Sequence, residues 1–365
     1  VFSTTGGALS HRNIIINGDF RVNQAGNKTG KTSHEKRMAG DRWSFDTNIG
    51  TWSGGTENDA PTGSGFVSSG YFNCTVQGTT GSGGYTIVTT RFEGQDLQHI
   101  RKGTSSAKPV TLSFWVKSPV TGTYICELYD GDNTRHCSQS YTISSANTWE
   151  YKSVTFPADT SGAFDNDNGL SLYVQWWLGA GTSYTSGTLQ TTWGNNTAAN
   201  RAVGQVNVGG TAHSSNNYFQ LTGVQLELGT VATPFEHRTF ADELRKCQRY
   251  FSKSDTYATA PAQQSDTKTV ATCIDMAVDL LRTPYIYFPV NMRDAPTVTL
   301  LEEGALTSGS SGEWAWFQSG TWQYGSFTAA SISEKGYAAH KSSIAGGGDG
   351  KAYYMHINWT ATAEL

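Results

Sequence analysis

The 365-residue sequence has few charged residues and few of the residues that favour helices. Charged side chains make up only 15% of the chain, and Leu, Lys and Glu are scarce for its length, whereas Gly occurs 41 times. Helices rely on Leu, Glu, Lys and Ala, while strands favour β-branched and aromatic residues between Gly, Asn and Ser turns. The composition therefore argues against a mainly helical fold and predicts an all-β one.

The sequence lacks the usual signals of nucleic-acid binding, membrane insertion and secretion. The net charge of −4, without any run of Lys or Arg, argues against nucleic-acid binding. No apolar stretch approaches the ~20 residues that a spanning helix needs, so membrane insertion is not predicted. No basic-then-apolar leader stands at the start. The chain begins at Val1, which leaves a processed terminus and a fragment as alternatives.

Cysteine is rare and irregularly spaced. The five cysteines form no C-x-x-C or Cys/His zinc pattern; they are Cys74, Cys126, Cys137, Cys247 and Cys273. A bridge between Cys126 and Cys137 across a hairpin is one reading, but a reducing cytoplasm keeps most thiols free. We expect free thiols and no cysteine-held metal.

No catalytic motif is present. The sequence has no G-x-S-x-G, Walker, H-E-x-x-H or G-x-G-x-x-G pattern, and its eight histidines are scattered. A glycosidase needs two facing carboxylates, for which the candidate pairs are Asp130 with Asp132, Asp165 with Asp167, and Glu302 with Glu303. Clusters of Asp, Asn and Gly more often form turns. We therefore expect a protein that is not an enzyme.

Alternating apolar and polar residues predict an antiparallel sandwich. Residues 110–117 and 218–228 alternate most clearly, and further strands are expected at 122–129, 149–156 and 170–178. Segment 13–16 is expected to be a short strand that ends in an Asn-Gly turn, and 51–84 to form loops and short strands. The chain thus predicts an all-β antiparallel jelly-roll sandwich, one short connecting helix and a second, smaller β-sandwich.

The helix is predicted at 239–251. Phe240, Leu244, Cys247 and Phe251 recur at helical spacing and form one apolar face. Thr239 is the expected N-cap, with an acid three positions later as its capping-box partner. The predicted domains are 1–237, the connecting helix and linker 238–257, and a distal β domain 258–365. Its principal strands are expected at 285–290, 297–300 and 353–359.

Three segments in this order resemble a module of phage tail-fibre and other virion proteins. They are 13–24 (NIIINGDFRVNQ) with the later GDRW at 40–43, the strand 112–117 (LSFWVK), and 223–229 (GVQLELG) running on through ATPFE into ELRKCQRYF at 243–251. Residues 288–298 and 359–365 resemble the distal domains that follow this module. The module itself is similar to jelly-roll carbohydrate-binding domains.

The resemblance implies a virion protein whose distal domain contacts the host. It also implies a homotrimer, and the apolar helix face offers a place for the three-fold contact. In jelly-roll carbohydrate-binding domains an Asn-Gly-x-Phe-Glu turn helps to hold calcium, but Arg21 stands here in place of the acid, and Gln220, Leu221 and Thr222 replace the closing Asp pair. Calcium needs several oxygen ligands. We therefore expect no metal and no cofactor.

Aromatic residues supply the candidates for ligand contact. Trp314 and Trp316 share one face of a predicted strand, and Trp322 and Tyr324 follow with the same alternation. Exposed rings stack on the apolar faces of sugars, so these four are the predicted glycan contacts. The alternative is that they lie in a core or a subunit interface, where Trp and Tyr are also favoured.

Other tryptophans are assigned to the interior. Trp43, Trp115 and Trp359 lie within the segments that carry the resemblance and are expected in the core. Trp176 and Trp177 are adjacent in one predicted strand, so one ring should face the core and the other the opposite face.

The function predicted from the sequence is a bacteriophage tail-fibre or surface-fibre component that binds a host-surface glycan or receptor. Its partners would be itself, other virion proteins and that receptor, and its location the virion surface after assembly in the host cytoplasm. One alternative is a purely structural head or tail decoration or adaptor that binds only virion proteins. Another is a polysaccharide depolymerase.

Overall fold

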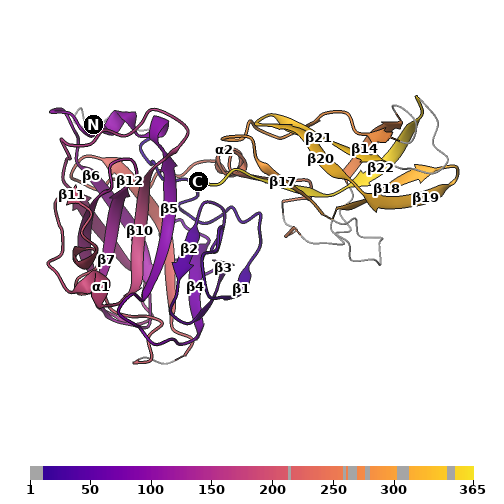
Figure 1. Cartoon of the computed structure of the whole chain (residues 1–365). Helices are drawn as coiled ribbons and strands as arrows, with labels where there is room; N and C mark the ends of the chain where they lie inside the picture. The colour runs from indigo at the N-terminus through magenta and orange to yellow at the C-terminus, as the bar shows by residue number, and fades with distance from the viewer. Residues whose placement is uncertain are drawn as a thin grey trace. The chain divides into compact units, whose positions relative to one another are not determined.

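The chain forms two compact units of mostly antiparallel strands. The structure, a computed structural model, describes residues 11–212, 215–257, 260–261, 269–275, 280–301, 312–342 and 350–365. The N-terminal unit comprises Val1–Asn23, Asn27–Glu243 and Leu365, and the C-terminal unit comprises Gln24–Gly26 and Leu244–Glu364. The strands of both units (Figure 1) confirm the predicted all-β fold class. Within the described residues, no helix is long and apolar enough to cross a membrane.

The N-terminal unit is a jelly-roll sandwich of two six-stranded sheets. The first sheet has the order β1 (Lys28–Lys31), β3 (Thr51–Glu57), β4 (Ser69–Val76), β12 (Tyr218–Leu228), β6 (Val110–Lys117) and β9 (Glu150–Phe156). The second has the order β11 (Gly194–Asn195), β8 (Arg135–Ile143), β7 (Gly122–Asp130), β10 (Leu170–Ala180), β5 (Tyr85–Glu93) and β2 (Ser44–Thr47). A one-turn helix, α1 (Thr182–Thr185), follows β10.

Strands with strong alternation lie where the sequence predicted them. The bounds of β6 and β12 match the prediction, and those of β7, β9 and β10 differ by at most two residues at an end. The glycine-rich segment 51–84, where loops and short strands were expected, holds two strands of seven and eight residues, β3 and β4. Gly70 lies within β4 because the ring of Phe20 packs against it, and a Cβ at this position would lie 2.3 Å from that ring.

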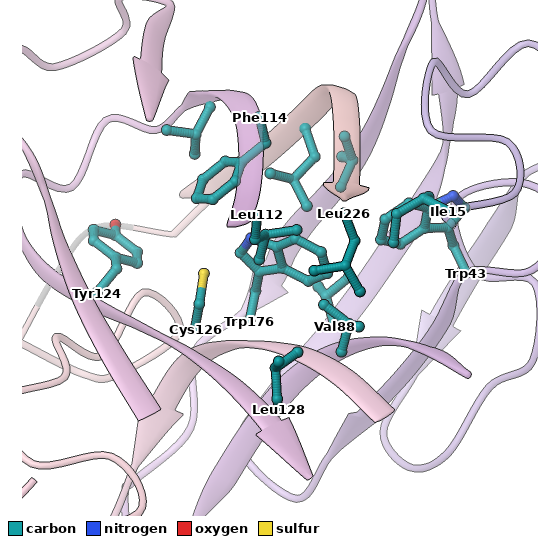
Figure 2. Packing of buried hydrophobic residues seen from close by; sticks show 14 of the residues in the cluster. Ile15, Trp43, Val88, Leu112, Phe114, Tyr124, Cys126, Leu128, Trp176 and Leu226 are labelled. Carbon is teal, nitrogen blue, oxygen red and sulfur yellow. The ribbon is translucent and has the colours of Figure 1, made fainter. Parts of the chain in front are cut away.

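The core lies between the two sheets and is built from alternate residues. Figure 2 shows Leu112 and Phe114 of β6 near Trp176 of β10, with Cys126 and Leu128 of β7 beside them. Burying large apolar side chains in this way supplies the main driving force for folding.

Adjacent tryptophans in β10 point to opposite faces, as predicted. Trp176 belongs to the main core, whereas Trp177 packs on the outer side of the sheet with Ile87 and Ile125. Its indole N–H donates to Glu127 Oε2 over 2.8 Å.

All five cysteines are buried free thiols. Cys126 lies opposite Gln139 and Cys137 opposite Leu128 in the β7–β8 ladder, so the two thiols do not face each other. Burial raises the pKa of Cys137 to about 12, which keeps this thiol protonated.

The predicted strand at 13–16 is wrong, because a side chain takes over the bonds that a ladder would make. Asn13 Oδ1 accepts from the amides of Ile15 (2.9 Å) and Leu226 (3.1 Å), and Asn13 Nδ2 donates to the Val224 carbonyl (3.0 Å). One backbone bond, from Ile14 to the Leu226 carbonyl, runs beside them. The segment is therefore extended but is not a strand.

The predicted Asn-Gly turn is confirmed, and it brings two motif segments together. Asn17 has a φ of 58°, and its carbonyl accepts from the amide of Phe20 and from the indole of Trp43. The Asn17 amide group donates to the carbonyls of Val22 (2.8 Å) and Asp41 (3.0 Å). The GDRW segment is thereby fixed to the first turn.

Arg238 ties the N-terminal segment to the chain that follows β12. Its guanidinium donates to the Ile15 carbonyl (3.0 Å), to the Asn13 carbonyl and to Glu243 Oε1 (2.8 Å). It also donates to Glu236, which accepts from the amides of Asn13 (2.8 Å) and His11 as well. One cation therefore neutralises two carboxylates and holds two distant segments together.

The predicted helix is present but shorter than expected. It is α2 (Phe240–Gln248), and Thr239 caps it as predicted, because its hydroxyl accepts from the Asp242 amide and donates to the Asp242 carboxylate. Phe251 lies in a strand and not in the helix, since the chain turns sharply after Gln248.

The four residues proposed for an oligomer contact do not share one exposed face. Cys247 and Phe251 are buried in this chain, whereas Phe240 is 38% exposed and Leu244 half-buried. A contact between copies through the helix would therefore rest on Phe240 and Leu244.

The C-terminal unit contains a small and a large sheet around one core. The small sheet has the order β13 (Phe251–Lys253), β23 (Trp359–Thr362) and β17 (Thr297–Leu300). The large sheet has the order β16 (Ile286–Tyr287), β21 (Gly336–Ser342), β15 (Leu280–Arg282), β14 (Thr269–Asp275), β22 (Ala352–Ile357), β18 (Glu313–Gln318) and β19 (Thr321–Ser326), and β20 (Thr328–Ser333) pairs with β21.

Of the strands predicted in this unit, only β17 has the expected bounds. The predicted strand 353–359 is divided into β22 and β23 at Asn358. The Asn358 carbonyl accepts from the Leu301 amide (2.8 Å) and the Trp314 indole (2.9 Å), so it is not available to a regular ladder. The strand predicted at 285–290 is reduced to two residues.

We predict that Arg238→Met destabilises the N-terminal unit by about 3 kcal/mol, because it leaves the buried carboxylate of Glu243 and the half-buried one of Glu236 without their cation. The measurement is chemical denaturation of the purified chain. Lys108→Met, at an exposed position, is the control and should change the stability by less than about 0.5 kcal/mol. Equal effects of the two substitutions would contradict the proposed role of Arg238.

A second prediction concerns the loss of stability at acidic pH, to which Glu236 should contribute. Burial alone would raise the pKa of Glu236, but the amides of Asn13 and His11 and the charge of Arg238 outweigh it and hold the pKa below its usual range. The stabilisation is therefore complete above the pKa of the unfolded chain and is lost as the pH falls through the folded value. Between about pH 7 and about pH 3, Glu236→Gln should lose less stability than the wild type; parallel losses would count against this.

Candidate functional site

Two of the four predicted glycan contacts lie in the core of the C-terminal unit. Trp314 and Trp316 of β18 are 0% and 4% exposed and pack against Phe327. Their indole N–H groups donate to the Asn358 carbonyl and to Gln318 Oε1, each at 2.9 Å. Neither ring can reach a ligand. The prediction was wrong for both, because alternation shows which residues share a face but not which face is inward.

The other two candidates lie on the opposite, outer face of the same sheet. In the β18–β19 ladder, Trp322 lies opposite Phe317 and Tyr324 opposite Ala315. Tyr324 and Phe317 are each 42% exposed. Hairpin register therefore separates these rings from Trp314 and Trp316.

Two rings that the sequence analysis missed complete this surface. The ring of Trp322 lies 5.4 Å from that of Phe317 and 5.9 Å from that of Tyr354, which is 48% exposed. On its inner side it lies 4.4 Å from the ring of His356. We call Phe317, Trp322, Tyr324 and Tyr354 the distal aromatic face. The sequence signal for Phe317 was that it directly follows Trp316 in the strand, so its side chain points to the opposite face.

The N-terminal unit has a second aromatic surface, centred on Trp115. Core residues alternate along β6, with Leu112, Phe114 and Val116 inside, so Trp115 points outward and is only half-buried. The expectation that Trp115 lies in the core was wrong, while Trp43 and Trp359 are buried as expected.

Trp115 forms the floor of a groove of about 530 Å³. This volume lies within the range of about 300–1,000 Å³ that is typical of small-ligand sites. The Trp115 ring lies 5.5 Å from that of Tyr151, which is 47% exposed and comes from the neighbouring strand β9. The lining residues of this Trp115 groove are Ser64, Phe66, Ser113, Trp115, Tyr151, Gly223, Ala232, Thr233, Pro234, Phe235 and His237.

One wall of the groove is the segment after β12, which folds back over the sheet. Glu227 accepts from the Thr233 amide (2.8 Å) and hydroxyl (2.6 Å), and Gln225 accepts from the Glu236 amide (2.8 Å). Gln225 and Glu227 are buried beneath this segment. The GVQLELG and ATPFE segments thus shape the groove by bonding to each other.

The other wall is the loop between β3 and β4, which carries Phe66. The Phe66 ring lies 5.0 Å from that of Phe235 and 5.3 Å from that of His237, so the two walls meet. Gly223 lies beneath it at a bulge in β12, with a φ of +60°, and a Cβ there would lie 2.5 Å from the ring. Glycine is needed here for both reasons.

The lining of the Trp115 groove combines aromatic rings, hydroxyl groups and the imidazole of His237. Its described lining contains no Asp, Glu, Lys or Arg, while Ser64, Ser113 and Thr233 supply hydroxyl groups. Aromatic walls with a few fixed polar groups are typical of sites that recognise a ligand by shape. A ligand with apolar faces and hydroxyl edges would fit both parts.

Carboxylates of the described pairs accept hydrogen bonds from backbone amides in turns, as expected, and one of them also forms an ion pair. Asp130 binds the ammonium of Lys102 and the amide of Asn133. Asp132 accepts from the Asp165 amide (2.9 Å), and Asp167 from the Gly169 amide (2.8 Å). The pair Glu302 and Glu303 lies outside the described residues.

Calcium does not fit the Asn-Gly turn. The guanidinium of Arg21 donates to Asp19, the acid that a metal would need, and to the Arg238 carbonyl. A divalent cation at this place would lie beside a fixed positive charge. In the part of the chain that the structure describes, no group of three or more His, Cys, Asp or Glu side chains could hold a metal ion.

The two tryptophans on opposite faces of the distal hairpin allow a direct test. Trp316→Ala should destabilise the C-terminal unit by about 3–5 kcal/mol, because it leaves a cavity in the core. Trp322→Ala, on the outer face, should cost about 1 kcal/mol or less. Denaturation of the two variants gives the comparison, and a larger loss for Trp322→Ala would contradict the assignment of the faces.

Comparison with known proteins gives only distant likenesses. No protein-family model and no curated protein matches the chain. Among solved structures, the chain is similar over 60% of its length to the enzymatically active domain of bacteriophage CBA120 tailspike protein 4 (13% identity, TM-score 0.32), of which it spans 21%. It is also similar over 58% to a structure described as CBM4 (9% identity, 98% of that chain, TM-score 0.31) and over 62% to the CBM22-1 xylan-binding domain of Paenibacillus barcinonensis Xyn10C (10% identity, 100% of that chain, TM-score 0.28). Likeness of this size does not extend to function.

Proposed function

We propose that this protein is a non-enzymatic surface component of a bacteriophage virion that binds carbohydrate of the host envelope. The observation that carries the carbohydrate part is the Trp115 groove, where exposed aromatic rings stand next to hydroxyl groups on an open sheet face. Sugars have flat apolar faces and polar edges. Rings such as Trp115 and Tyr151 can stack on those faces, while serine and threonine hydroxyls bind the edges.

The phage part of the proposal rests on the resemblance of the three sequence segments to tail-fibre proteins. Buried free thiols suit a protein that is assembled in the reducing cytoplasm of a host. A fibre of this kind is expected to be a homotrimer that also contacts other virion proteins. Several weak sites on a symmetric oligomer would then give firm attachment through avidity.

The distal aromatic face is a second candidate contact. The ring of Trp322 contacts those of Phe317 and Tyr354. Tyr324, Phe317 and Tyr354 keep more than a third of their surface exposed. Under the alternative of a structural adaptor, this face and the groove would both be covered by virion proteins. Under the alternative of a depolymerase, a carboxylate pair would have to face the ligand.

Substitution at the Trp115 groove tests the proposal. Trp115→Ala and Tyr151→Ala should each weaken binding of the protein to whole host cells or to an arrayed glycan by about 2 kcal/mol, roughly 30-fold, as expected for a central aromatic contact. The matched control is Tyr173→Ala, which removes a half-buried ring from β10 of the other sheet.

The result also separates the alternatives. Equal binding by all variants would remove the groove from the proposed function. Binding of virion proteins without any glycan or cell signal would favour the adaptor. Release of reducing sugars from host polysaccharide, abolished by Asp132→Ala or Asp167→Ala, would favour the depolymerase.

A further inference from the structure

We propose that the Trp115 groove continues along the same sheet face into a second subsite around Lys117, and that its ligand is an uncharged polysaccharide chain. The inference rests on the proposed function and deepens it by naming the class of ligand. The evidence comes from Lys117, Trp149 and Tyr218, which lie beside the groove and do not line it.

The second subsite lies one step further along the strands. Trp115 and Lys117 alternate with buried residues of β6, so both point outward and lie about 7 Å apart along the strand. Thr222 and Gln220 of β12 lie opposite them in the ladder. On the other side of β6, Tyr151 lies opposite Trp115. Thr222 and Gln220 are buried, so the accessible part of this row lies on β6 and β9.

Lys117 fixes two aromatic rings at this second position. Its ammonium lies 5.9 Å from the ring of Trp149 and 5.8 Å from the ring of Tyr218. The same ammonium is 2.7 Å from Asp59 Oδ2, and the Trp149 indole donates to Asp59 Oδ1 over 3.2 Å. Trp149 and Tyr218 are both only half-buried, so their rings keep surface for a ligand.

Polar groups extend the row across the sheet. Gln220 lies between Lys117 on β6 and Tyr71 on β4 in the two ladders, and its amide donates to Glu57. The Tyr218 hydroxyl donates to Asn147 over 2.7 Å. Gln220 is buried and positions Glu57, whereas the phenol of the half-buried Tyr218 can bind a sugar hydroxyl without a charge.

The charges on this face favour an uncharged ligand. Lys117 is paired with Asp59 (2.7 Å), and Glu57, which accepts from the Gln220 amide, adds a further carboxylate. At the groove wall, Arg12 donates to the Thr233 hydroxyl and the Pro234 carbonyl.

An anionic chain at the second subsite would therefore meet the carboxylates of Asp59 and Glu57, and it would have to break the ion pair between Lys117 and Asp59 to gain that cation. A neutral chain can use the rings and hydroxyl groups of this face and leaves that ion pair intact. The aromatic positions at Trp115 and Trp149 give such a chain two places to stack.

The test is calorimetric titration of the full chain with disaccharides and hexasaccharides. The neutral probes are the cello-, xylo- and manno-oligosaccharides, and the anionic probe is hexagalacturonate. We expect at least one neutral hexasaccharide to bind about tenfold more tightly than its disaccharide, with the same affinity in about 20 mM and about 500 mM salt. Hexagalacturonate should not bind.

Variants locate the second subsite. Trp149→Ala and Lys117→Met should each weaken hexasaccharide binding about tenfold and leave disaccharide binding unchanged, since the shorter ligand needs only the groove. Tyr173→Ala, on the other sheet, should change neither.

The failures are distinguishable. Salt-sensitive binding of hexagalacturonate, without binding of neutral chains, would overturn the ligand class and leave carbohydrate binding intact. Equal affinity for disaccharide and hexasaccharide, or variants without effect, would overturn the second subsite alone. Absence of binding by every probe would overturn the proposed function together with this inference.

Discussion

The fold of the N-terminal unit depends on the ion cluster around Arg238. The guanidinium joins two stretches of chain that lie 223 positions apart, from Arg238 to the Ile15 carbonyl, and it neutralises Glu236 and Glu243 at the same time. No sheet ladder is available to do this, because the N-terminal segment is extended without being a strand. Charge-assisted hydrogen bonds take the place of the ladder. Since removal of one partner from such a cluster leaves buried charge behind, the cluster is needed as a whole.

The same cluster determines the shape of the proposed binding surface. Glu236, which Arg238 holds from one side, donates its amide to Gln225 on the outer face of β12. The segment between them is fixed to the sheet by Glu227 and becomes one wall of the Trp115 groove. The segments that carry the resemblance are therefore mostly scaffold. Of the rings that would meet a ligand, Trp115 lies within the resemblance segment LSFWVK, whereas Tyr151 and Phe66 lie outside those segments. The resemblance therefore predicts the scaffold and only part of the ligand contact.

Local patterns predicted the elements, and long-range contacts decided the sites. Alternation was sufficient for β6 and β12, and side-chain chemistry for the cap at Thr239. The strand at Asn13 failed because an amide side chain competes with the ladder, which a period of two cannot reveal. Trp115 and Trp316 were each assigned to the wrong face, since alternation groups residues without saying which group is buried. That choice follows from the partner strands, and their register is a property of the whole fold.

Scarcity of charge, the first property noted in the sequence, bears on the kind of partner that the protein can have. The sheet face around Trp115 presents Lys117 as a cation that is already paired with Asp59. Its attraction for a ligand must therefore come from apolar contact and neutral hydrogen bonds, which depend little on salt. Each such contact is weak, and flat rings such as Trp149 and Tyr151 tolerate many sugars. A protein built in this way gains strength from repetition of the contact along a chain and among copies, and not from one deep pocket.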